Sequence, residues 1–428
     1  MQKLREIQRG LQEGAYHEEL SRVYGADEST AVDRLTALLR GFCDFYGADG
    51  DTPVALYSTP GRTEIGGNHT DHQQGRGLAA SVNLDTIACV APTGTNVIRI
   101  QSEGHKLCQI DLGNLAPVAG ELGHSPSLVR GIAAKITEMG YTVGGFDAYT
   151  TTRVLRGSGL SSSATFEVLV ATIVNHLFCG GALSATELAQ VAQYSENAYF
   201  GKPCGLMDPI SCATGGVIAI DFKNKDNPTI RQVDFDLMKA GYALCIVDSG
   251  VSHAGLHTEY AAIPHEMGTV AACFGRKLLS EVNPAAFFAN IASVRETCGD
   301  RAVLRAIHFY NDDAAVEAEL AAVRRGDMAE FLRQVNRSGQ SSWMYLQNIS
   351  TYRDPRNQGL GVLLAVADHL LEGKGAFRVH GGGFAGTIQA FVPLTMLERF
   401  IAGMETVSGP GSCHVLSFRG TGTCALIS

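Results

Sequence analysis

Polar and chargeable side chains are concentrated in residues 59–75, where glycines separate them and apolar side chains are scarce. Arg62, His69 and Asp71 fall within ten residues of one another in this segment. A guanidinium, an imidazole and a carboxylate at such spacing can bind a polar ligand, whereas a loop that is merely solvated needs none of them. Because functional side chains concentrate on loops that a scaffold holds in place, we predict a binding site here.

A second segment, residues 153–167, has the composition of a phosphate-binding loop that leads into a helix. Gly157 and Gly159 let the backbone approach a ligand closely and adopt positive φ. The first N–H groups of a helix have no partner inside the helix, and they bind anions, phosphate above all. Three serines stand at the predicted helix start: Ser161, Ser162 and Ser163. An ordinary serine-rich helix cap is the alternative interpretation.

Two other glycine-rich patterns do not support a nucleotide site of a known type. Residues 381–386 fit G-x-G-x-x-G, but a dinucleotide-binding loop must follow a strand and open a helix. This segment instead runs into a strand-like stretch, residues 387–392, which argues against a dehydrogenase. A P-loop is excluded because neither Lys202 nor Lys374, each of which follows a glycine, precedes Ser or Thr.

Regular elements that would hold these segments are indicated by the hydrophobic periodicity. The apolar run 166–178 predicts a buried helix behind the serine loop. Ser184 and Glu187 form a capping box that predicts a helix from about residue 185. Helices are also expected over residues 1–50, at 128–139 and from about 264 to 347, and strands at 54–57, 79–92, 97–101, 149–155, 217–222, 242–248 and 423–427.

Composition indicates a globular protein of two domains. The chain has 428 residues, of which 45% are hydrophobic and 18% charged, and this length exceeds that of one ordinary core. A net charge of −9 argues against nucleic acid or an anionic membrane as the main partner. No long apolar run or signal peptide is evident, and eleven cysteines without a C-x-x-C pair favour reduced thiols in the cytoplasm.

Taken in order, these segments resemble the three motifs of the GHMP kinase superfamily. Gly61-Arg62 followed by His69-Thr70-Asp71 is similar to the galactokinase signature G-R-x-N-L-I-G-E-H-T-D-Y. Residues 157–164 resemble the second motif, G-x-G-L-S-S-S-A, and residues 380–393 resemble the third, T-G-G-G-F-G-G. Two shorter matches are Gly205-Leu206-Met207-Asp208, which resembles G-I-M-D, and Glu259-Tyr260, which resembles a sugar-contacting Glu-Tyr.

The resemblance implies an α+β fold of two domains with the active site in the cleft between them. The N-terminal α/β domain is expected to be related to ribosomal protein S5 domain 2, and the C-terminal domain to be ferredoxin-like. We assign residues 1–50 to a helical extension, 51–235 to the first domain and 236–428 to the second. The implied reaction is phosphorylation of the anomeric hydroxyl of galactose by MgATP. The partners are then a sugar and MgATP, without nucleic acid or membrane, and the chain is expected to be a monomer or weak homodimer.

The resemblance also implies a role for each site residue. Phosphoryl transfer depends mainly on positioning and charge neutralisation, and Asp208 would take the proton of the sugar while Arg62 steadies it. Ser163 and Glu196 would supply oxygen ligands to Mg²⁺. The residues expected to contact the sugar are Asn68, His69, Thr70, Asp71, Gly205 and Tyr260. Those expected to contact ATP are Ser102, Gly157, Ser158, Gly159, Leu160, Ser161, Ser162 and Ser163.

The sequence also departs from the galactokinase signature. Asn68 stands where the signature has Glu, Glu64 replaces its Asn, His72 replaces its Tyr, and Pro209 replaces Gln after Asp208. Loss of a negative charge at position 68 would suit a sugar with a carboxylate at C6, so galacturonate or another galacto-configured sugar is an alternative substrate. A sensor that binds ATP and sugar without catalysis is a further alternative, which the retained motif residues disfavour.

Overall fold

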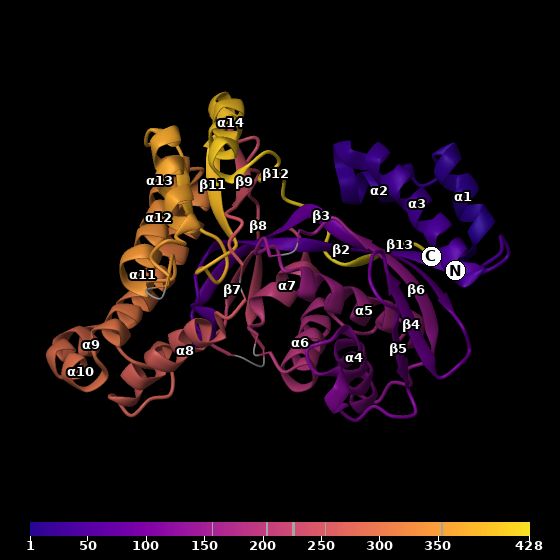
Figure 1. The fold of residues 1–428 in the computed structure, drawn as a ribbon, viewed down its shortest axis with the longest axis horizontal. Helices are drawn as coiled ribbons and strands as arrows, with labels where there is room; N and C mark the ends of the chain where they lie inside the picture. The colour runs from indigo at the N-terminus through magenta and orange to yellow at the C-terminus, as the bar shows by residue number, and fades with distance from the viewer. Residues whose placement is uncertain (156, 203, 225–226, 253, 352–353) are drawn as a thin grey trace.

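Two sheets organise this computed structural model, which describes residues 1–428 except 156, 203, 225–226, 253 and 352–353 (Figure 1). The larger sheet has nine strands in the order β1-β2-β3-β6-β4-β5, with β13 also paired to β2, and β7 and β8 continuing from β3. Its strands are β1 (Gln2–Lys3), β2 (Pro53–Gly66), β3 (Arg76–Pro92), β4 (Val97–Ser102), β5 (Cys108–Asp111), β6 (Phe146–Thr152), β7 (Val217–Asp221), β8 (Thr229–Val233) and β13 (Cys424–Ile427). The smaller sheet, of order β10-β11-β9-β12, has β9 (Tyr242–Asp248), β10 (Ala376–Val379), β11 (Thr387–Pro393) and β12 (Cys413–Leu416).

Strand β2 is much longer than the predicted strand at 54–57, and it includes the first half of the segment that the sequence favoured as a loop. It pairs antiparallel with β3, and the register shifts near Pro60 and again near Gly66. Irregularities of this kind let a strand accommodate proline and re-aim side chains. All of β2 after Pro53 is buried, so its polar side chains Arg62 and Glu64 have partners inside the protein and not in water.

Helices cover both faces of the larger sheet (Figure 1). One face packs against α4 (Ser125–Glu138), α5 (Ser162–Phe178), α6 (Ala185–Ser195) and α7 (Met207–Thr214). The predicted buried helix is α5, and the predicted capping box is confirmed, with the Glu187 backbone N–H donating to Ser184 Oγ at 3.3 Å. The other face packs against α1 (Leu4–Glu13), α2 (His17–Tyr24) and α3 (Glu28–Tyr46).

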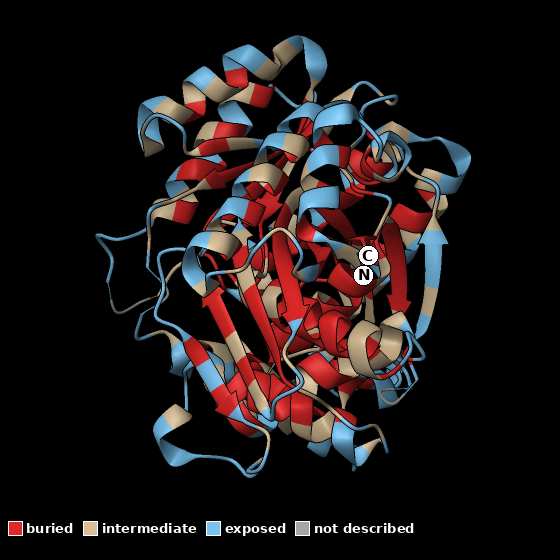
Figure 2. Ribbon diagram, turned by 90° about the vertical axis from the view of Figure 1, so that its right-hand side faces the viewer, coloured by how far each residue is buried: buried red, intermediate tan, exposed pale blue. Residues whose placement is uncertain are grey.

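The smaller sheet is covered on one face by α13 (Gly359–Leu371) and α14 (Leu397–Ser408). Its other face meets the larger sheet through an apolar cluster that includes Ile65, Leu244 and Phe391. The helical pattern predicted over 264–347 corresponds to α8 (His257–Ala272), α9 (Pro284–Ala289), α10 (Ile291–Cys298), α11 (Asp300–Arg325) and α12 (Met328–Ser341). In Figure 2 buried residues follow the strands, and exposed residues lie on the outer surfaces of the helices.

The chain crosses from the first sheet to the second between β8 and β9, and the domain boundary at residue 235 stays a prediction. The chain does not remain in the second sheet, because β13 pairs antiparallel with β2 through Cys424 and Ser58. The two termini therefore lie side by side (Figure 1). Residues 1–50 are an integral layer of the first domain, since Leu426 and Ile427 pack in the same core as α1–α3. Within the described part of the chain, no helix is both long and apolar enough to cross a bilayer.

Candidate active site

The centre of the site is an ion pair between strand β2 and the first turn of α7. Arg62 Nε donates to Asp208 Oδ1 at 2.6 Å, and Nη2 donates to Oδ2 at 2.5 Å. Arg62 Nη1 also donates to the carbonyl of Gly159, and Ser161 Oγ donates to Asp208 Oδ2. A two-pronged contact of this kind fixes both distance and orientation. The fold thus brings the two predicted catalytic residues together with the serine loop.

Asp208 is held ionised by its surroundings. Burial alone would raise the pKa of its carboxyl group, but the Arg62 charge and the hydrogen bonds from Arg62 and Ser161 outweigh burial and lower the pKa below its usual value. A carboxyl with a depressed pKa is present as carboxylate at neutral pH. The site therefore contains a carboxylate base next to a fixed cation.

The serine loop ends at the N-terminus of α5, as predicted. Ser161 adopts left-handed backbone geometry with φ of 58°, which is uncommon for a residue with a side chain and is found at functional sites. The first backbone bond of the helix runs from the Thr165 N–H to the Ser161 carbonyl at 3.0 Å. The N–H groups of residues 162–164 precede that bond, and the positive end of the helix dipole adds to their attraction for an anion. Arg156, within this loop, lies outside the described residues.

Not every predicted ATP contact faces this helix end. Ser158 is buried, and its hydroxyl donates to the Leu155 carbonyl at 2.7 Å. Leu160 is also fully buried. Ser102 lies at the end of β4, where its hydroxyl accepts a hydrogen bond from Thr150 at 2.8 Å. These three side chains are engaged in the scaffold, so of the loop residues Ser158 and Leu160 can reach an anion only through their backbone.

Three predicted sugar contacts lie around the glycine-rich third motif and α7. Asp71 Oδ2 lies so close to Gly205 that a Cβ there would overlap it, which explains why a residue without a side chain is needed. His69 Nε2 is 3.0 Å from the Gly382 carbonyl. Burial lowers the pKa of His69 to about 4, with His72 adding to the effect. Neutral His69 then donates from Nε2 and keeps Nδ1 as an acceptor.

Asn68 and Thr70 lie in the wall of the site. Both are fully buried. The Thr70 hydroxyl donates to backbone carbonyls of its own loop, 2.9 Å from that of Gly67 and also close to that of Arg76. Asn68 uses both ends of its amide in hydrogen bonds within the protein. The direct sugar contacts expected of these two residues are therefore not evident in their hydrogen bonding.

The predicted metal ligand Glu196 is buried at the start of a π-helical turn, Glu196–Phe200. Lys202 Nζ donates to Glu196 Oε1 at 2.8 Å, so a cation already occupies one side of this carboxylate. Glu167, one turn after Ser163 on α5, is fully buried with neither carboxylate oxygen hydrogen-bonded to a described residue. Burial, followed by the nearby charge of Glu196, raises the pKa of Glu167 well above its usual value.

Comparisons with known proteins identify relatives of this chain. Residues 127–216 match the family model of the GHMP kinases N terminal domain, and residues 40–92 match the galactokinase galactose-binding signature. The chain belongs to the GHMP kinase superfamily. A galactokinase from Streptomyces coelicolor is 28% identical over 372 residues, which span 85% of this chain and 90% of that protein. This GHMP kinase is a sugar kinase of the galactokinase type, and the family uses ATP.

Solved structures share the fold of this GHMP kinase. The Lactococcus lactis galactokinase complexed with galactose superposes with a TM-score of 0.78 at 23% identity, covering 91% of this chain and 99% of that one. The Methanococcus jannaschii mevalonate kinase gives a TM-score of 0.60 at 12% identity over 86% and 98% of the two chains. The predicted two-domain α+β architecture is thereby confirmed.

Sequence reasoning assigned no role to Glu167, Lys202 or Arg378. Glu167 could have been found, since it follows Ser163 by four residues and so lies on the same face of a helix. Lys202 was considered only as a P-loop lysine. Arg378 is buried in β10 and gave no sequence signal, because its partners Glu64 and Ile65 are more than 300 positions away.

Proposed function

We propose that this GHMP kinase transfers the γ-phosphate of ATP to the anomeric hydroxyl of galactose. The observation that carries the proposal is the two-pronged Arg62–Asp208 pair, placed where the N-termini of α5 and α7 meet. The galactose-binding signature over residues 40–92 supports the choice of sugar. Phosphoryl transfer needs alignment, a proton acceptor and charge neutralisation, and these groups supply all three.

In this proposal Asp208 accepts the proton of the anomeric hydroxyl as that oxygen attacks. Arg62 keeps the carboxylate ionised and oriented before the reaction, and it stabilises negative charge in the transition state. The N–H groups at the start of α5 hold the phosphates of ATP. Their positions are fixed by the buried helix behind them, so little reorganisation is needed during the transfer.

Mg²⁺ fits the acidic side of the site. The described residues contain no group of three or more His, Cys, Asp or Glu that could hold a metal ion alone, so phosphate oxygens and water would complete the shell. Ser163 and Glu196 would supply the protein oxygens. The buried oxygens of Glu167 have no described partner, and this excess of acidic oxygen suits a divalent cation. When bound, the ion would neutralise charge on the transferred phosphate.

The alternative substrate galacturonate loses its support. It rested on the absence of negative charge at position 68, but Glu64 Oε1 accepts a hydrogen bond from Asn68 Nδ2 at 2.9 Å. The Asn68 amide is therefore engaged within the protein, and its lack of charge gives no preference for a carboxylate at C6. A sensor without catalysis is also disfavoured, because the Asp208 carboxylate, the proposed base, accepts hydrogen bonds from both Arg62 and Ser161.

The test is ATP consumption by the purified protein with Mg²⁺, measured side by side with galactose, galacturonate, glucose and N-acetylgalactosamine. We expect galactose to give the highest kcat/KM and the product to be the 1-phosphate, identified by ³¹P NMR. A preference for galacturonate would transfer the assignment to that sugar. ATP binding without turnover of any sugar would favour the sensor.

A further inference from the structure

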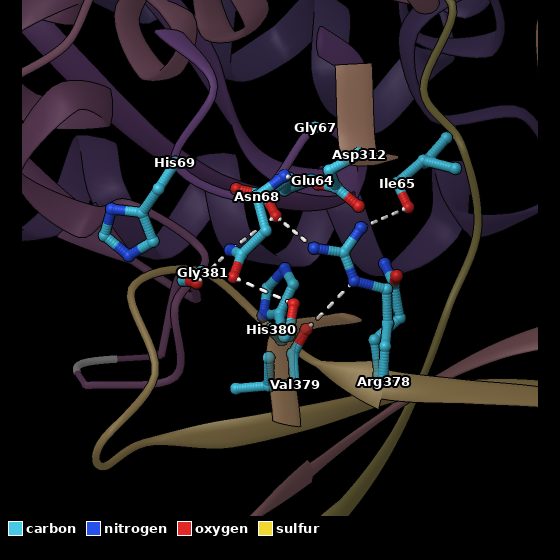
Figure 3. A network of polar contacts seen from close by, with 12 residues as sticks. Glu64, Ile65, Gly67, Asn68, His69, Asp312, Arg378, Val379, His380 and Gly381 are labelled. Atoms are coloured by element: carbon cyan, nitrogen blue, oxygen red, sulfur yellow. Dashed lines mark hydrogen bonds and ion pairs between the residues drawn. The ribbon is translucent and has the colours of Figure 1, made fainter. Parts of the chain in front are cut away.

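Asn68 makes six hydrogen bonds inside the protein, and Figure 3 shows it beside Glu64, Asp312 and Gly381. Its amide Nδ2 donates to Glu64 Oε1 at 2.9 Å and to the Gly381 carbonyl at 2.7 Å. Its amide oxygen accepts from Asn348 Nδ2 at 2.9 Å and from Ser342 Oγ at 3.3 Å. With two donors and two acceptors engaged, the amide has used its hydrogen-bonding capacity.

The backbone of Asn68 is bound as well. Its N–H donates to Asp312 Oδ2 at 2.5 Å, and its carbonyl lies 2.9 Å from His308 Nε2. Both of these partners belong to α11. Among the partners of the amide, Glu64 lies on β2, Ser342 and Asn348 follow α12, and Gly381 lies between β10 and β11. Five of the six bonds therefore cross from the first domain to the second. Asn68 is a fixed point of the interface between the domains.

Glu64 is the acidic member of the same network and is anchored by Arg378 (Figure 3). Arg378 Nη2 donates to Glu64 Oε1 at 2.5 Å, and both side chains are almost completely buried. The remaining Arg378 donors reach the carbonyls of Ile65, at 2.8 Å, and Val379, at 3.1 Å. A buried ion pair whose other donors are also satisfied holds its partners in one geometry.

Side chains on this side of the site form hydrogen bonds with the backbone carbonyls of three consecutive glycines, Gly381, Gly382 and Gly383. Asn68 binds the Gly381 carbonyl, as above, and His69 and Asn348 lie 3.0 and 3.1 Å from that of Gly382. The Tyr260 hydroxyl donates to the Gly383 carbonyl at 2.7 Å. Two predicted sugar contacts, His69 and Tyr260, are thereby positioned through the same glycine loop that Asn68 fixes.

The positions of the acid and the amide are exchanged relative to the galactokinase signature. That signature has Asn at the place of Glu64 and Glu at the place of Asn68, whereas this chain has the reverse. In this chain the two side chains are hydrogen-bonded to each other. We propose that Asn68 is a positioning residue, which with Glu64 and Arg378 sets the glycine loop, and that it does not read the C6 group of the sugar. This inference rests on the proposed sugar kinase function.

The first test replaces Asn68 and compares two sugars that differ only at C6, galactose and 6-deoxygalactose. If Asn68 only positions the loop, Asn68→Ser lowers kcat/KM for both sugars by the same factor, about tenfold or more. The ratio of the two kcat/KM values then stays within about twofold of the wild-type ratio. The exposed residue Asn290 gives a matched control, Asn290→Ser, which should change neither value.

Two results of this test would overturn the inference. One is a change of about tenfold or more in the ratio of the sugars, which is the signature of a lost contact at C6. The other is an unchanged kcat/KM for both. If the wild-type protein turns over no sugar, the proposed function fails, and the network is then judged by the second test, which needs no substrate.

The second test exchanges the pair and measures thermal unfolding. Asn68→Glu places a second carboxylate beside Glu64 in a buried site, and Glu64→Asn removes the carboxylate that forms the ion pair with buried Arg378, so each single change should lower Tm. The double variant again has one acid and one amide. We expect its Tm to exceed that of both single variants, a non-additive result that shows coupling. Additive losses would contradict the exchanged-pair assignment.

Discussion

The Arg62 guanidinium and the Asp208 carboxylate face each other in a two-pronged pair, with Nε–Oδ1 and Nη2–Oδ2 distances of 2.6 and 2.5 Å. Arg62 lies on a buried strand and Asp208 in the first turn of a helix, 146 positions later. The pair therefore has no local cause in the sequence. It exists because α7 packs against β2 and β3, and the catalytic proposal depends on it.

Replacing Asp208 with Asn should remove the proton acceptor while retaining the size of the side chain. Loss of a general base lowers kcat by about 10² to 10⁴, and we expect sugar binding, measured by calorimetry, to remain largely intact. Asp300→Asn, at an exposed carboxylate paired with Arg295, is the control and should be active. Near-normal turnover by the Asp208 variant would exclude its role as base.

Replacing Arg62 with Lys should shift the pH profile. Lysine keeps the positive charge but cannot make the two-pronged contact, so the pKa of Asp208 should rise from its depressed value. Because the base must be unprotonated, the acid limb of the kcat/KM profile should move to higher pH. We expect activity at neutral pH to fall about tenfold or more, from loss of a charge-assisted hydrogen bond. An acid limb at the wild-type position would show that Arg62 does not control this titration.

Adding a methyl group at Gly205 should disturb the sugar side. A Cβ there would overlap Asp71 Oδ2, and the carboxylate must turn away. We expect the KM for the sugar to rise about tenfold, the cost of one lost or displaced hydrogen bond, with Tm nearly unchanged because only a side chain moves. Gly120→Ala is the control, since nothing lies within 4 Å of its added Cβ. An unaltered KM would argue against Asp71 as a sugar contact.

Neutralising Glu196 should weaken metal binding. Glu196→Gln removes the charge of the proposed ligand, and we expect Mn²⁺, used as a probe for Mg²⁺, to bind about tenfold more weakly in the presence of ADP. Electron paramagnetic resonance of free Mn²⁺ measures this without turnover. Glu138→Gln, at an exposed carboxylate on α4, is the control. Equal affinity in both variants would remove Glu196 from the metal site.

Glu64 should make stability depend on pH. Burial raises its pKa to about 7 from an ordinary value of 4.5, although Arg378 opposes the shift. The folded protein therefore binds this proton more tightly than the unfolded chain, and the resulting stabilisation is complete below about pH 4.5 and is lost as pH rises through about 7. The loss is about 3 kcal/mol.

The comparison with Glu64→Gln isolates this contribution, because glutamine does not titrate. The free energy of unfolding of the wild type, relative to the variant, should fall by about 3 kcal/mol across that interval. Urea unfolding of the wild type and the variant at a series of pH values measures the two free energies of unfolding. Parallel curves for the two proteins would show that Glu64 has the same pKa in the folded and unfolded states.

The sequence by itself determined the local elements and the chemistry that they carry. The helix behind the serine loop, the capping box at Ser184 and the unpaired N–H groups at the helix start follow from periodicity and from the backbone groups that a helix leaves unpaired. The order of the motifs indicated the superfamily and the two-domain fold. Each of these features depends on residues that are near one another in the chain.

Only the tertiary structure decided which side chains face the site. Asn68 resembled a sugar contact, yet its partners come from α11, the turn after α12 and the glycine loop, which are distant in sequence. Strand β2 extends through the predicted loop because its backbone pairs with β3 and because Arg378 forms an ion pair with Glu64. Buried hydrogen bonds between distant segments leave no periodic trace in the sequence, so burial and orientation emerge only when the two domains pack together.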